Sequence, residues 1–91
     1  MCKINKPVID VIATAQKIKS CRLKAGFSVR QLQSIFNFTS PQAIYNWEKG
    51  RDIPTVDNLI VLAEIYGIQV DDIIVTRYVE IECSGIIKKT A

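Results

Sequence analysis

The chain has 91 residues, of which 48% are apolar and 23% charged, and its net charge is +3, which describes one ordinary globular domain. No apolar run reaches the roughly 18–20 residues of a membrane-spanning helix, and Asp10 interrupts the N-terminal apolar stretch, so neither a membrane span nor a signal peptide is predicted. The chain has no histidine, which removes the commonest general base and metal ligand.

Two short helices are predicted in the first part of the chain. Thr14 is suited to cap a helix that ends at Gly26, because glycine readily takes the left-handed conformation of a helix C-terminus. Ser28 and Gln31 have the spacing of a capping box, which predicts the start of a second helix. Asn37 is expected to end it, since asparagine tolerates a positive φ better than other non-glycine residues. The apolar positions expected to face inward are Ile18, Cys21 and Ala25, then Leu32, Ile35 and Phe36.

Three further helices are predicted in the middle of the chain. Ser40 is a capping residue and Pro41 follows it at the first helical position, which predicts a sharp start for a third helix that Gly50 ends. Thr55 caps a fourth helix, Gly67 closes it, and "VDDII" is typical of a brief fifth. Five short helices in succession predict a compact all-α domain.

Strand patterns lie near both ends of the chain. "RYVEIEC", residues 77–83, alternates with the period of a half-buried strand, and "KPVIDVI", residues 6–12, is the other β-leaning run. The two can pair, but an isolated ribbon is marginally stable and would have to lie on the helices or on a second subunit. We expect the C-terminal strand to cap the fold, with dimer formation as the alternative. The predicted organisation is an N-terminal arm (1–13), a helical domain (14–74) and a C-terminal extension (75–91).

The outward face of the predicted third helix is polar without being strongly charged. Ile44 and Trp47 share the inner stripe, so we expect Trp47 in the core. The outer positions are Gln42, Tyr45, Asn46 and Lys49. The major groove of B-DNA admits one α-helix, and amide side chains can pair bidentately with adenine there. This face therefore predicts contact with double-stranded DNA.

Charge is distributed unevenly along the chain. Residues 1–51 hold nine Lys or Arg and two acids, a net charge of +7, whereas residues 52–91 hold three Lys or Arg and seven acids, a net charge of −4. A basic half that carries the polar helix favours a polyanionic partner on one face. The alternative is two solvated surfaces of uneven charge, and charge alone does not decide between them.

Five short motifs follow one another in a familiar order. They are "I-K-x-x-R", "S-V-R-Q-L", "A-I-Y-N-W-E-K-G", "IP-T-V-D-N-L" and "G-I-Q-V-D-D-I-I". In this order and spacing they resemble the lambda-repressor/Cro-type (XRE-like) helix-turn-helix DNA-binding family. The resemblance covers roughly Thr14 to Ile74 and implies the five-helix fold of that family.

The resemblance implies roles for particular residues. Gln42 and Asn46 match positions that contact bases, Pro41 matches a neighbouring contact position, and Tyr45 lies between them. The residues expected at the DNA backbone are Ser28, Arg30, Ser40, Lys49 and Arg51. Arg22 and Glu48 match a structural ion pair of the family.

The sequence also departs from the family pattern at the second helix and the turn. Val29 replaces a glutamine that often holds a phosphate, so Arg30 is expected to substitute for it. Gln33 stands where an alanine normally packs, and Asn37 replaces the turn glycine. The turn "NFTSP" is one residue longer than usual, which affects the angle of the third helix.

The function predicted is that of a transcriptional regulator that binds DNA as a homodimer, with no cofactor, no metal and no enzymatic activity. Three widely spaced cysteines without a C-x-x-C motif predict reduced thiols and a cytoplasmic protein. Two alternatives stay open. One is an antitoxin whose residues 75–91 bind a partner protein, and the other is a protein-interaction adaptor that has lost DNA binding.

Overall fold

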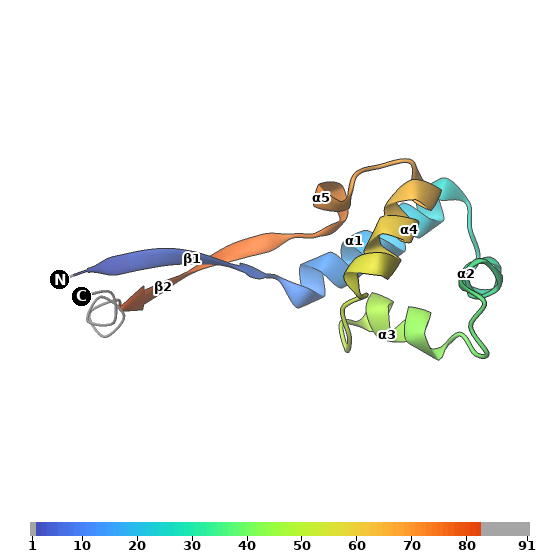
Figure 1. Cartoon of the computed structure of the whole chain (residues 1–91), viewed down its shortest axis with the longest axis horizontal. Helices are drawn as coiled ribbons and strands as arrows, with labels where there is room; N and C mark the ends of the chain where they lie inside the picture. Colours follow the sequence, from blue (N-terminus) through green and yellow to red (C-terminus); the bar gives the residue numbers. More distant parts are fainter. Residues whose placement is uncertain (1, 83–91) are drawn as a thin grey trace.

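The structure, a computed structural model, describes residues 2–82. Figure 1 shows a body of helices from which a ribbon of two strands projects. The helices are α1 Val11–Ala25, α2 Val29–Phe36, α3 Gln42–Lys49, α4 Val56–Tyr66 and α5 Val70–Ile73, and the strands are β1 Lys3–Ile9 and β2 Thr76–Glu82. The predicted five-helix architecture with a strand near each terminus is confirmed.

Most helix ends lie where local sequence signals place them. Ser28 and Gln31 form the predicted capping box of α2, and the Thr55 hydroxyl accepts a hydrogen bond from the Asn58 backbone at the start of α4. Asn37 ends α2 with a φ of 57°, the left-handed conformation expected for it. These ends are fixed by contacts over three or four residues, which is why the sequence alone predicts them.

Two helix starts differ from the prediction. Helix α1 begins three residues before Thr14, at Val11, because the Asp10 carboxylate accepts a hydrogen bond from the Ala13 backbone at 3.0 Å. Thr14 is fully buried instead, and its hydroxyl accepts from the Val75 backbone N–H at 3.0 Å. The predicted start of the first helix at Thr14 is therefore wrong, since residues 11–13, which the prediction gave to the N-terminal arm, belong to α1.

Helix α3 begins one residue later than predicted, at Gln42, with Pro41 at the capping position. The Ser40 hydroxyl still accepts a hydrogen bond from the Gln42 backbone N–H, at a distance of 3.4 Å. Proline contributes no backbone N–H, so the donor that Ser40 can satisfy is that of the following residue. The start of α3 is therefore sharp, as expected, but lies one position further along the chain.

The core lies where the five helices meet. Its buried apolar residues are Ile18, Leu32, Ile44, Trp47, Leu59, Leu62, Ala63 and Ile73. Trp47 is in the core as predicted, and the rings of Phe36 and Phe38 contact it edge-on. Two inward positions were predicted wrongly, because Ala25 is exposed and Ile35 is 48% exposed.

The ribbon pairs β1 with β2 in antiparallel register, from Lys3 opposite Glu82 to Ile9 opposite Thr76. The sequence left open whether the two segments pair within one chain, and the structure pairs them there, but the expectation that the C-terminal strand caps the fold is wrong. The ribbon extends away from the helices in Figure 1, and most of its side chains are exposed. The predicted strand residue Cys83 lies outside the described residues.

The cysteines do not all behave as predicted. Cys21 is a free thiol, whereas Cys2 is disulfide-bonded. The expectation of reduced thiols is wrong for Cys2, because an odd number of cysteines still allows one bond beside one free thiol. Within residues 2–82 no helix has both the length and the apolar character needed to cross a membrane.

Candidate nucleic-acid interface

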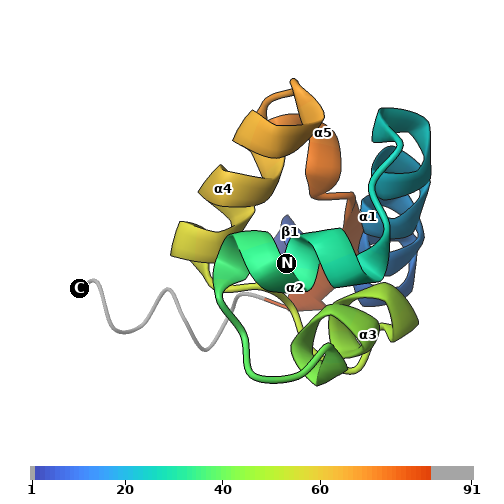
Figure 2. The same ribbon diagram turned by 90° about the vertical axis from the view of Figure 1, so that its right-hand side faces the viewer.

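Helices α2 and α3 are joined by a turn over residues 38–41. Helix α2 lies at the end of the helical body away from the ribbon, and α3 runs back from there along the body, so that Gly50 at its end lies beside Ile12 at the start of α1 (Figure 1). Figure 2 views the α2 end of the body directly, with α2 in front and α3 below it. The amide of Gln33 donates to the Phe38 carbonyl at 3.3 Å, and the Phe38 backbone N–H donates to the Gln33 carbonyl at 3.0 Å. Gln33, a departure from the family pattern, thus holds the longer turn against α2.

A buried ion pair fixes the inner side of α3. The Arg22 Nε donates to Glu48 Oε2 at 2.6 Å, and Nη2 donates to Oε1 at 3.0 Å. The two side chains are only 10% and 6% exposed. The hydrogen bond to Glu48 raises the pKa of Arg22 above its ordinary value, so the guanidinium stays charged across the whole physiological range. It joins α3 to α1 and turns the opposite face of α3 outward.

The outward face of α3 carries the residues predicted to contact bases. Gln42 and Tyr45 are exposed, while Asn46 and Pro41 are half-buried. The Lys49 Nζ lies 5.9 Å from the centre of the Tyr45 ring, within range of a cation–π contact. Because Gln42, Tyr45 and Lys49 are exposed, this face is accessible to a partner.

The amides on this face form a chain of hydrogen bonds. Gln42 Nε2 donates to Asn46 Oδ1 at 3.0 Å, and Asn46 Nδ2 donates to Asp52 Oδ2 at 3.3 Å. Asp52 was not predicted from the sequence as a site residue. The chain reverses at Gly50, where the backbone is left-handed, and this reversal brings Asp52 back beside Asn46. The glycine that ends α3 was the available signal for this contact.

The residues predicted to meet the DNA backbone are all exposed. They are Ser28 at the cap of α2, Arg30 in its first turn, Ser40 before α3, Lys49 at the end of α3 and Arg51 after it. Two of the hydroxyls also accept backbone hydrogen bonds near helix starts, since Ser28 accepts from the Gln31 backbone and Ser40 from the Gln42 backbone. The exposed cations thus lie before the two amides in the chain, at Arg30 on α2, and after them, at Lys49 and Arg51.

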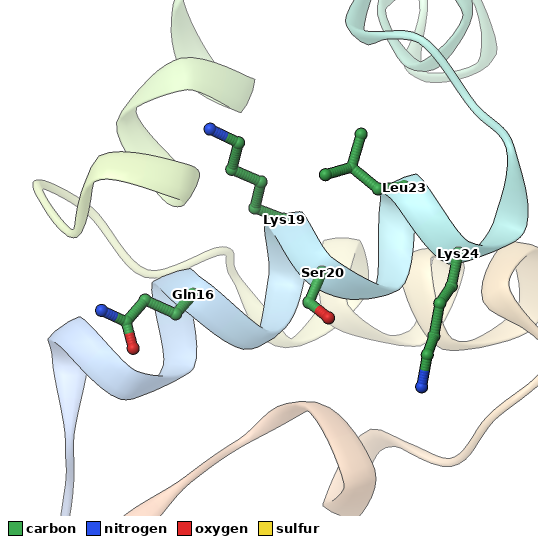
Figure 3. A pocket seen from close by; sticks show the side chains of 5 residues that line it. All are labelled: Gln16, Lys19, Ser20, Leu23 and Lys24. Atoms are coloured by element: carbon green, nitrogen blue, oxygen red, sulfur yellow. The ribbon is translucent and has the colours of Figure 1, made fainter.

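A shallow hollow lies on α1. Its lining residues are Gln16, Lys19, Ser20, Leu23 and Lys24. All of them come from one helix, and the side chains of Lys19 and Lys24 point in opposite directions in Figure 3. Because these groups do not converge on a common point, we assign no ligand to the hollow.

A capped second helix, a tight turn and a third helix with an accessible polar face define a helix-turn-helix domain. The profile of the helix-turn-helix family HTH_3 matches residues 18–73, and the chain belongs to this family, which is of the lambda-repressor/Cro type. Membership makes the chain a DNA-binding regulator in general terms, with double-stranded DNA as its partner. The family is typically non-enzymatic.

Two solved structures are similar to this chain. One is the DNA-binding domain of BldD, with a TM-score of 0.60 and 21% identity over 71% of this chain and 93% of that one. Another is the S. venezulae BldD DNA-binding domain, with the same TM-score and identity over 71% of this chain and 96% of that one. At this identity the likeness shows the fold. The comparison with curated proteins gave no match.

Proposed function

We propose that the chain is a cytoplasmic, sequence-specific transcriptional regulator that inserts α3 into the major groove of its operator and acts by occupying it. Gln42, Asn46, Tyr45 and Pro41 contact base edges in this proposal. The DNA backbone contacts are Ser28, Arg30, Ser40, Lys49 and Arg51. The observation that carries the proposal is the accessible amide pair of Gln42 and Asn46 on a helix anchored from behind by the Arg22–Glu48 ion pair.

The physical argument joins rigidity with chemistry. A recognition helix discriminates bases only if its side chains keep one geometry. The ion pair holds α3, the helix that carries the two amides, against α1. Amides offer both donors and acceptors to base edges, whereas the Lys and Arg side chains attract phosphates regardless of sequence. The face therefore combines readout and positioning on one surface.

The proposal includes a homodimer in which the ribbon is the contact between two copies. One face of the ribbon, here called the aliphatic face, carries Ile4, Val8, Val79 and Ile81, brought together by the register of the strands, with Lys6 opposite Val79 and Arg77 opposite Val8 on the same face. Ile4 is 43% exposed and Val79 36% exposed. A two-stranded ribbon is marginal in water without a surface to pack on, and a second ribbon of the same kind supplies one. Two copies would also present two recognition helices to paired half-sites.

The antitoxin alternative depends on residues 75–91, of which 83–91 lie outside the described residues. The adaptor alternative requires that the surface has lost affinity for phosphates. Arg30, Lys49 and Arg51 are exposed and make no ion pair within residues 2–82, and this favours DNA binding.

The experiment is selection of bound sequences from random duplex DNA, followed by a salt titration on the recovered sequence. We expect a motif with two half-sites about one helical turn apart. The affinity should fall steeply with salt, because phosphate contacts release counterions. Recovery of no motif together with a flat salt response would overturn the proposal in favour of the adaptor.

A further inference from the structure

The carboxylate of Asp52 determines the orientation of the two amides on α3. An ionised carboxylate only accepts hydrogen bonds, so the side chain of Asn46 must turn its NH2 group toward Asp52. The oxygen of Asn46 then faces Gln42, which donates to it through Nε2 at 3.0 Å. The Asp52 carboxylate, the last acceptor in this series of hydrogen bonds, thus fixes the orientation of Asn46 and, through it, that of Gln42.

The reversed orientation is disfavoured by a direct electrostatic conflict. If the Asn46 amide rotated by a half-turn, its oxygen would face the Asp52 carboxylate, and two acceptors would meet without a proton between them. Gln42 would then have to turn its own oxygen toward the Asn46 NH2. With an apolar side chain in place of Asp52, the hydrogen bond between Gln42 and Asn46 could form in either arrangement.

The two arrangements present different patterns to a base. In the observed one, Gln42 keeps its oxygen and one N–H free, and this matches adenine, whose N7 accepts and whose N6 donates. In the reversed one, Gln42 has both N–H groups free, and this matches guanine, whose N7 and O6 both accept. The orientation of one amide therefore selects between the two purines.

We propose that Asp52 is a specificity-determining positioning residue, which through Asn46 sets Gln42 to favour adenine over guanine. The inference rests on the proposed insertion of α3 into the major groove. Asp52 is itself held in place, because the backbone N–H groups of Arg51 and Asp52 donate to the Asn46 carbonyl at 3.0 and 3.4 Å. Its contact with Asn46 is thus built into the end of α3.

Asp52 also carries a negative charge, and its effect on a polyanion must be separated from its positioning role. Removing the charge strengthens binding to every duplex, whereas removing the acceptor changes only the choice between bases. Asp57, an exposed acid in the first turn of α4, is a matched control, since Asp57→Asn removes the same charge without touching the amides. Asp52 is exposed, so its variants retain the fold.

The experiment compares the full chain on the selected duplex and on a copy with the adenine at the Gln42-dependent position changed to guanine. We expect the wild type to prefer adenine on the order of tenfold. Asp52→Ala and Asp52→Asn should bring this ratio close to one, because alanine has no acceptor and asparagine can donate as well as accept. Asp57→Asn should leave the ratio unchanged. Adding Gln42→Ala to Asp52→Ala should change the ratio no further.

Two results would overturn the inference, and they are distinguishable. An unchanged adenine preference in both Asp52 variants, with Gln42→Ala still abolishing it, would remove the role of Asp52 and leave the proposed function intact. A protein in which neither Gln42→Ala nor any Asp52 variant alters base preference would overturn the inference together with the insertion of α3.

Discussion

Arg22 of α1 and Glu48 of α3 meet through two parallel hydrogen bonds, Nε to Oε2 at 2.6 Å and Nη2 to Oε1 at 3.0 Å. The remaining guanidinium nitrogen, Nη1, donates to the Phe27 carbonyl at 3.0 Å, which ties the same arginine to the segment before α2. A single side chain thus connects three elements of the domain. The recognition face is oriented by a contact on the reverse side of its helix.

Breaking this pair from one side should be costly. Glu48→Gln leaves the Arg22 charge buried without its counterion, and we expect a loss of about 3 kcal/mol in the free energy of unfolding. The double variant Arg22→Met/Glu48→Leu buries no charge and should lose less than the single variant. Urea unfolding of the three proteins measures this, and a double variant less stable than Glu48→Gln would contradict the buried-charge argument.

Thr14→Val should destabilise the junction between the helices and the ribbon. The Thr14 hydroxyl accepts from the Val75 N–H at 3.0 Å and donates to the Val75 carbonyl at 3.3 Å. Valine keeps the shape but leaves a buried backbone N–H without that acceptor, at a cost of roughly 1–3 kcal/mol. Urea unfolding tests the loss, and Thr76→Val, an exposed neighbour, is the control that should change little.

Tyr66→Phe should flatten the loss of stability at alkaline pH. Burial raises the pKa of the Tyr66 hydroxyl above its ordinary value, and no described residue forms a hydrogen bond with it. Because the pKa is raised on folding, the group stabilises fully below about pH 10 and loses that contribution as pH rises further. Unfolding free energies at pH 7 and about 10.5 should differ less for Tyr66→Phe than for the wild type. An identical difference in both proteins would show that the hydroxyl titrates freely.

Gln42→Ala and Lys49→Ala should have different effects on DNA binding. The first should relax base preference at one position and cost roughly 1–3 kcal/mol on the preferred site. The second should weaken binding to all sequences alike and lower the slope of affinity against salt. Titrations on the selected and a random duplex separate the two, and equal behaviour of both variants on both duplexes would contradict the proposed division of roles.

Val79→Asp should dissociate the proposed dimer. Val79 lies on the aliphatic face of the ribbon opposite Lys6, so the new carboxylate has a partner within the ribbon but cannot be buried between two copies. Tyr78→Asp changes the adjacent residue, which points to the other face, and should leave the dimer intact. Sedimentation equilibrium gives the mass of each variant, and a wild-type monomer at all concentrations would remove the ribbon contact from the proposal.

The sequence by itself determined the features that depend on neighbours in the chain. The capping box at Ser28, the cap at Thr55 and the left-handed Asn37 each involve backbone groups three or four residues away, so propensity and spacing were enough to predict them. The sequence also indicated a strand near each end of the chain, but left open whether the two strands pair within one chain. The register of this pairing was not predicted, because it depends on contacts between residues at opposite ends of the chain.

Only the tertiary structure decided the features that join distant residues. The sequence predicted Thr14 as the cap of α1, but the backbone of Val75, 61 positions after Thr14, engages the Thr14 hydroxyl, and Asp10 caps the helix. Asp52 reaches Asn46 because the chain reverses at Gly50, a geometry that residue identity permits without dictating. The ribbon leaves the helices rather than covering them. Contacts of this kind depend on where folded elements lie in space, and local sequence signals do not extend that far.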